Sequence, residues 1–121
     1  TEKDAEMLID NDCKFVVEAA NMPCTEEAIK LFNDKLVVVA PSKAVNAGGV
    51  AVSALEMRQN AGWDKWSFPQ VDNKLRAIMK QIHNLCLKHA RKYGAEGDYT
   101  LGANAGGFLR VANAAIAHGI I

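Results

Sequence analysis

Hydrophobic and polar positions divide the chain into an N-terminal part with short apolar runs and a longer part with helical periodicity. Residues 14–20 (KFVVEAA) and 36–40 (LVVVA) are compact runs of strand-forming residues, which is typical of buried parallel strands. Thr25 precedes two glutamates, which predicts a helix from there to about residue 33. Residues 3–10 resemble the end of an earlier helix. A strand, a short helix and a second strand predict a parallel pair joined by a right-handed crossover.

The rest of the chain is expected to be helical. Its predicted elements are a helix at about 43–60, a loop at 61–70, a long helix at about 70–93 and a last helix at about 103–118. Gly94 and Gly119 are expected to end the last two helices. Gly48 and Gly49 are unfavourable in a helix interior, so they should lie at a helix end or where another backbone comes close.

Charge and composition restrict the class of protein. The chain has 121 residues, of which 50% are hydrophobic and 23% are charged, and this excludes a disordered tail. Its 14 basic and 14 acidic residues cancel, so no net positive field attracts nucleic acid or an anionic membrane. No apolar run approaches the roughly 18 residues of a membrane span, and the N-terminus is too acidic for a secretory signal.

The charges are nevertheless unevenly distributed. Residues 1–35 carry nine acidic and four basic side chains, whereas residues 58–92 carry eight basic and two acidic ones. Several of the basic residues lie outside the apolar stripe of the long predicted helix, which favours a solvated face over a nucleic-acid surface.

Cysteine and histidine spacing does not indicate a metal or redox centre. Cys13, Cys24 and Cys86 form no CxxC pair, and their low density favours a reducing, cytoplasmic compartment over a disulfide framework. His83 and His89 are six residues apart, so a helix would turn them away from each other. We therefore expect no metal site.

Several catalytic signals are also missing. The sequence contains no GxGxxG, P-loop or GxSxG motif, and the glycine-rich residues 102–107 follow no predicted strand, which favours a role in helix packing. Glu18 and Glu56 are candidate acid and base groups, but nothing in the sequence places them in one site. Two strands alone do not form a stable sheet, and the chain begins without methionine. These features indicate part of a larger polypeptide.

The candidate chemistry lies after the two predicted strands, where open parallel sheets bind ligands. Asn21 follows the first strand and Asn46 follows the second, so both are expected on the same rim of the sheet. A side-chain amide offers a donor and an acceptor, which suits a carboxamide or an amino-acid head group. The alternative is that each asparagine closes a turn or caps a helix.

A second candidate feature is the helix that begins near Gly48 and Gly49. Val50 and Ser53 are three residues apart and share one face of it. The glycines allow a ligand or another backbone to approach the first turn, and the helix N-terminus favours a carboxylate. The Ser53 hydroxyl would bond that anion or, alternatively, bond back to the preceding turn.

The segments VVEAANMPCTEEAIKLF and VVVAPSKAVNAGGVAVSALEMRQN resemble the C-terminal part of hexameric glutamate dehydrogenases, within the Glu/Leu/Phe/Val dehydrogenase family. The segments DNKLRAIMKQIHNLC and YTLGANAGGFLRVANAAIAHGII resemble the end of the same family, so the likeness covers nearly the whole chain. It implies reversible oxidative deamination of L-glutamate to 2-oxoglutarate and ammonium, with hydride transfer to NADP. NAD remains the alternative cofactor, because the residue that reads the ribose lies upstream.

The resemblance also implies an organisation. The fold class is α/β, with residues 1–60 forming the last βαβ part of a Rossmann-type cofactor domain. Residues 61–121 would form a closing helical segment that packs back toward a substrate domain. The full-length protein would be a cytoplasmic homohexamer.

The resemblance assigns roles to the four candidate site residues. Asn21 would lie beside the nicotinamide, and Asn46 would face both the nicotinamide and the amino-acid end of the substrate. Val50 and Ser53 would line the substrate pocket, with Ser53 bonding the side-chain carboxylate.

Two positions depart from the family pattern. The family usually has glycine where Ala19 and Ser42 stand, so each adds a side chain where the backbone approaches the cofactor or turns sharply. The family's catalytic lysine and aspartate and its dinucleotide fingerprint lie upstream, so we expect the 121-residue chain alone to be inactive. The alternatives are a non-enzymatic α/β ligand-binding module and an assembly element whose small-residue helices pack against another subunit.

Overall fold

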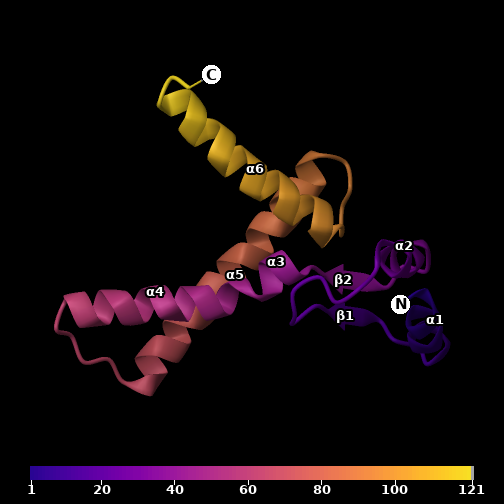
Figure 1. Ribbon diagram of the computed structural model, residues 1–121, viewed down its shortest axis with the longest axis horizontal. Coiled ribbons are helices and arrows are strands. Elements are labelled where there is room, and N and C mark those ends of the chain that lie inside the picture. The colour runs from indigo at the N-terminus through magenta and orange to yellow at the C-terminus, as the bar shows by residue number, and fades with distance from the viewer. Residues whose placement is uncertain (121) are drawn as a thin grey trace.

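The computed structural model describes residues 1–120 and contains a small parallel sheet followed by long helices. The elements in chain order are α1 (Glu2–Asp10), β1 (Phe15–Val17), α2 (Glu26–Asp34), β2 (Val38–Ala40), α3 (Ser42–Val45), α4 (Ala47–Ala61), α5 (Phe68–Lys92) and α6 (Tyr99–Ala117). Figure 1 shows the sheet with α1 and α2 at one end of the molecule and α4, α5 and α6 extending away from it. The predicted α/β class, with two parallel strands and then long helices, is confirmed.

The two strands are shorter than the sequence predicts. β1 and β2 pair in parallel, from Phe15 opposite Val38 to Val17 opposite Ala40. Leu36, predicted to begin the second strand, instead has a left-handed φ of 58° and ends α2, with its N–H donating to the carbonyl of Asn33 at 3.1 Å. A helix that ends in a left-handed residue leaves no extended backbone at that position, so the strand starts two residues later.

The N-terminal core lies between α1, α2 and β2. Thr25 starts α2 as predicted, because its Oγ1 accepts the N–H of Ala28 at 3.3 Å. Phe32 is 2% exposed and is the largest fully buried side chain. The buried apolar residues of this cluster are Ala5, Ala28, Phe32, Val37 and Val39. By contrast, Phe15 and Val17 of β1 are 70% and 60% exposed, so this core covers one face of β1 and leaves the other open.

The predicted helix at 43–60 is two helices that meet at Asn46. The N–H of Asn46 donates to the carbonyl of Ser42 at 2.8 Å and closes the single turn of α3, after which α4 begins at Ala47. Gly48 lies in the first turn of α4, as expected, and faces α5: a Cβ atom there would lie 3.3 Å from Sδ of Met79. The glycine therefore permits close contact between the two helices.

Helices α5 and α6 both begin earlier than predicted, in each case because a polar residue caps the N-terminus of the helix. The predicted loop at 61–70 ends at Ser67, which forms a capping box with Gln70 and donates its N–H to Oε1 of that residue at 2.7 Å. The start of α6 is Tyr99 instead of residue 103, since Oδ1 of Asp98 accepts the N–H of Leu101 at 2.9 Å.

The ends of these helices follow the prediction. Gly94 and Gly119 lie just past α5 and α6 and take left-handed φ values of 74° and 67°. α5 is the longest helix within residues 1–120. The start of α4 packs against its middle, near Met79, and α6 crosses it near Cys86, toward its end (Figure 1). Within residues 1–120, no helix combines the length and apolar character needed to cross a membrane.

Candidate functional site

The structure brings the two predicted rim asparagines together at the carboxyl ends of the strands. Nδ2 of Asn46 lies 3.5 Å from Oδ1 of Asn21, a long hydrogen bond between loops 25 residues apart. Asn46 is the N-cap of α4, yet its side chain makes no capping hydrogen bond to that helix. Its amide bonds the Asn21 side chain instead of the helix end, so the side chain of Asn46 does not cap α4.

On α4, Val50 lies about one turn beyond Asn46 and Ser53 about two turns beyond it. Val50 is 75% exposed, and Oγ of Ser53 donates to the carbonyl of Gly49 at 3.3 Å. The structure therefore contains the alternative in which the Ser53 hydroxyl bonds back to the preceding turn. A hydroxyl in this position keeps acceptor lone pairs and can rotate its proton to another partner, so the two interpretations of Ser53 are compatible.

Sequence reasoning missed the structural role of Glu18. This residue is only 5% exposed, and its Oε2 accepts the N–H of Ser42 at 2.9 Å. Its own N–H donates to the carbonyl of Ala40 at 3.0 Å, so Glu18 holds the end of β2 through both its backbone and its side chain. Oε1 is buried without a hydrogen-bond partner. The sequence signal that could have indicated this role is an acidic residue at the end of an apolar strand run. A carboxylate buried there needs a specific hydrogen-bond partner.

Glu18 and the exposed Glu56 do not share an environment. Glu18 is enclosed where the strands end, whereas Glu56 is on the surface of α4. The structure therefore gives no support to an acid–base pair formed by these two side chains.

Cys24 lies in the loop after Asn21, and its surroundings favour the protonated thiol. Burial and then the neighbouring Glu18 carboxylate raise the pKa of the Cys24 thiol. Burial likewise raises the pKa of the Cys86 thiol on α5. A nucleophilic cysteine needs the opposite shift, so neither thiol is activated in this environment.

One side-chain bond connects the rim to the last helix. Nζ of Lys43 on α3 donates to Oδ1 of Asn104 on α6 at 2.5 Å. On α5, Nδ1 of His83 lies 3.2 Å from the hydroxyl of Tyr99, while His89 packs beside Gly106 of α6. The part of the chain that the structure describes holds no group of three His, Cys, Asp or Glu side chains suited to a metal ion.

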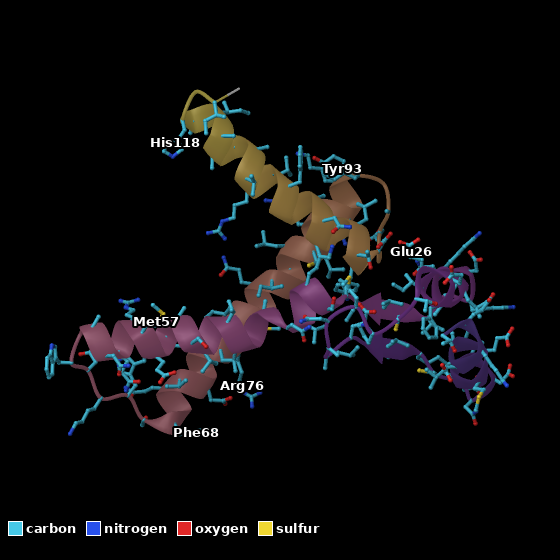
Figure 2. All side chains as sticks on the ribbon, viewed as in Figure 1. Glu26, Met57, Phe68, Arg76, Tyr93 and His118 are labelled. Carbon is cyan, nitrogen blue, oxygen red and sulfur yellow. The ribbon has the colours of Figure 1, made fainter. Side chains whose placement is uncertain are left out.

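Figure 2 places Phe68 and Tyr93 at opposite ends of α5 and Met57 on α4. Between α3, α5 and α6 is an open cleft of about 890 Å³. Its cationic lining residues are Lys43, Lys88, Lys92 and Arg110. One of these residues, Lys43, also donates to Asn104 at the edge of the cleft.

Neither departure from the family pattern requires a glycine in this structure. Ala19 and Ser42 are absent from the positive-φ positions of residues 1–120, so a side chain at each is compatible with its backbone conformation. Ser42 instead contributes its N–H to Glu18, a contact that depends on the backbone alone.

Comparison with known proteins agrees with this arrangement. The family model of Glutamate/Leucine/Phenylalanine/Valine dehydrogenase matches residues 1–119. The NADP-specific glutamate dehydrogenase of Psychrobacter sp. (strain TAD1) is 52% identical over 124 residues, covering 99% of this chain and 28% of that protein. The NAD-specific glutamate dehydrogenase of Bacteroides fragilis is 50% identical over 119 residues, covering 98% and 27% of the respective chains. The solved structure of Plasmodium falciparum glutamate dehydrogenase 2 matches with a TM-score of 0.94 at 43% identity, covering 100% of this chain and 26% of that one.

The family model matches almost the whole chain, from the parallel strands through the long helices, and this match defines the class of protein. The chain belongs to the Glu/Leu/Phe/Val dehydrogenase family. It spans about a quarter of the length of the relatives that it matches, with 28% of the Psychrobacter protein covered.

Proposed function

We propose that this chain is the C-terminal part of a glutamate dehydrogenase, an oxidoreductase that interconverts L-glutamate with 2-oxoglutarate and ammonium. The observation that carries the proposal is the Asn21–Asn46 amide pair, 3.5 Å apart at the carboxyl ends of two parallel strands and next to the first turn of α4. NADP is the proposed cofactor and NAD the alternative, since the Psychrobacter relative is named NADP-specific and the Bacteroides relative NAD-specific.

The rim residues have the chemistry that a nicotinamide carboxamide requires. The single long bond between Asn21 and Asn46 uses Oδ1 of Asn21 and Nδ2 of Asn46. The side-chain Nδ2 of Asn21 and Oδ1 of Asn46 remain free to bind a further amide. NADP, when bound, supplies or accepts the hydride. Asn21 and Asn46 would orient its carboxamide, and Asn46 would also contact the amino-acid end of the substrate.

The start of α4 is the proposed substrate face. Val50 offers an exposed apolar contact, and Ser53 would exchange its bond to the Gly49 carbonyl for a bond to the substrate side-chain carboxylate. A hydrogen bond to a charged group contributes about 1.5–3 kcal/mol, more than the neutral back-bond that it replaces.

Exposed apolar side chains support the proposed organisation. Trp63, Phe68 and Phe108 are 94%, 82% and 71% exposed, and all three lie in the helical segment at residues 61–121. Such surface is usually covered, which agrees with this segment packing toward a substrate domain and with assembly as a homohexamer. Residues 1–60 would complete a Rossmann-type cofactor domain. Cys13, Cys24 and Cys86 are free thiols, which suits a cytoplasmic protein.

The proposal is tested with the full-length gene product, by following oxidation of NADPH, and separately NADH, with 2-oxoglutarate and ammonium. We expect turnover, and we expect Ser53→Ala to raise the KM for 2-oxoglutarate about tenfold or more, as loss of a charged hydrogen bond predicts. Asn60→Ala, exposed near the other end of α4, is the matched control and should keep the parent constants.

Two results would contradict the proposal. A folded full-length protein that is inert with both cofactors would favour the alternative of a non-enzymatic ligand-binding or assembly module. Turnover by the 121-residue chain alone would contradict the expectation that its catalytic groups lie upstream.

A further inference from the structure

We propose that Glu18 is a positioning residue that sets the spacing between the two loops carrying Asn21 and Asn46. The inference deepens the proposed function and rests on it, because the two asparagines are the groups through which Glu18 would act. Glu18 itself would touch neither cofactor nor substrate.

The first step of the argument is that Glu18 fastens two separate parts of the chain. From the end of β1, its N–H reaches the last residue of β2, Ala40, at 3.0 Å. Its Oε2 reaches the first residue of α3, Ser42, at 2.9 Å. Glu18 is only 5% exposed, so solvent does not compete for the bond to Ser42.

The second step is that both asparagines are connected to Glu18 by short lengths of chain. Asn21 follows Glu18 by three residues, and Asn46 follows Ser42 by four. The helical turn of α3 is closed by the 2.8 Å bond from the N–H of Asn46 to the carbonyl of Ser42. A displacement of Ser42 therefore moves Asn46 as well, because the turn between them is hydrogen-bonded as a unit.

The third step is that Ser42 supplies the one N–H or O–H hydrogen bond that this buried carboxylate accepts within residues 1–120. Oε2 accepts the N–H of Ser42, Oε1 accepts no N–H or O–H, and the Cys24 thiol lies beside the carboxylate. Burying a carboxylate is costly unless it is specifically bound. Fixing the start of α3 beside the end of β1 gives this buried group a role.

The test compares Glu18→Ala with Glu18→Gln in the full-length gene product, assayed by NADPH oxidation. Alanine removes the acceptor and frees the two loops, so we expect kcat/KM to fall by up to about 100-fold, as a 1 Å misplacement can cause. We expect both a higher KM for NADPH and a lower kcat. Glutamine retains an acceptor oxygen, so it should restore kcat/KM to within about threefold of the parent.

Phe32→Leu is the control for a general loss of stability. Phe32 is fully buried in the N-terminal core and makes no side-chain hydrogen bond to either loop, so this variant should lower Tm and keep the kinetic constants of the parent. A matching loss of kcat/KM in Phe32→Leu would overturn the positioning role.

A double-mutant cycle identifies the group through which Glu18 acts. In an Asn46→Ala background, Glu18→Ala should cost much less than it does in the parent, because the group to be positioned is already missing. Independent, additive losses would overturn the inference.

Ser42→Pro tests the same bond from the donor side, should Glu18→Ala not fold. Proline is favoured at the first helical position, and Pro41 has the extended φ and ψ of −72° and 148° that a residue before proline needs. Ser42→Pro removes the N–H that Glu18 binds and should reproduce the loss of kcat/KM. Parent-like constants in Ser42→Pro or in Glu18→Ala would overturn the inference while leaving the dehydrogenase proposal intact, whereas an inert parent would overturn the proposed function and this inference with it.

Discussion

A Cβ atom at Gly102 would lie 2.1 Å from the carbonyl oxygen of Cys86, so α6 crosses α5 at backbone contact. No real Cβ atom approaches an oxygen this closely, and the atom that it would meet is backbone and cannot rotate away. Cys86 is 4% exposed and Ala90, one turn further along α5, is completely buried. The absence of a side chain at Gly102 therefore determines how close the two helices come.

Gly102→Ala is accordingly expected to lower stability strongly. Overpacking costs about 1–3 kcal/mol and occasionally more, and backbone contact places this site at the upper end. Gly107→Ala is the control, since a Cβ there meets nothing within 4 Å and alanine in a helix gains up to about 1 kcal/mol over glycine. Thermal unfolding of the two variants of the full-length protein should show Tm changes of opposite sign. Equal changes would contradict the close crossing.

Leu36→Gly is expected to raise stability. Leu36 has a left-handed φ of 58° just after α2 and is 90% exposed. This conformation costs a non-glycine residue about 1–2 kcal/mol, while the extra freedom of glycine when unfolded costs about 0.5–1 kcal/mol, so the net gain should approach 1 kcal/mol. Leu36→Asn, which also tolerates the left-handed region, should give a smaller gain in urea denaturation. A loss in both variants would show that the leucine side chain is packed against another part of the full-length protein.

The Cys24 thiol is expected to make stability depend on alkaline pH. Burial and then Glu18 raise its pKa in the folded chain above the unfolded value. The folded state thus holds the thiol proton more tightly: this stability is fully present below the unfolded pKa of about 8.5 and is lost as pH rises through the folded pKa. Between pH 8 and pH 10, Tm should fall more steeply in the parent than in Cys24→Ser, which has no proton to lose in this range. Parallel Tm curves would refute the shift.

Ala19→Gly, which restores the residue usual in the family, is not expected to stabilise the rim. Ala19 does not have a positive φ, so glycine relieves no strain and only adds freedom to the unfolded chain. The expected loss is about 0.4–1 kcal/mol. A clear gain in Tm, or a lower KM for NADPH in the full-length protein, would show that the Ala19 methyl group obstructs the site.

The main elements could be predicted from the sequence because their signals are local. The apolar runs around Val16 and Val39, the cap at Thr25 and the terminal glycines Gly94 and Gly119 each act over a few residues. The errors also have local causes. Helices α5 and α6 begin earlier than predicted because Ser67 and Asp98 cap them. Both residues are visible in the sequence, but the apolar pattern alone predicts later starts.

The contacts between distant segments could be predicted only in outline. The shared rim of Asn21 and Asn46 followed from the rule that parallel strands end on the same edge, and the structure places the two amides together. The Glu18–Ser42 and Lys43–Asn104 bonds join residues 24 and 61 positions apart, for which periodicity and propensity contain no information. The break of the predicted helix at Asn46 likewise depends on how α3 is held at the end of β2.

The two-stranded sheet has a consequence for how this stretch of chain behaves when it is separated from the rest of a protein. Phe15 and Val17 are exposed on β1, and in residues 1–120 each strand has a neighbour on one side only. Unpaired strand edges beside apolar side chains are templates for pairing with further copies. Proteolytic release of this stretch should therefore yield a polypeptide that self-associates and precipitates, and in a cell it would be bound by chaperones or degraded.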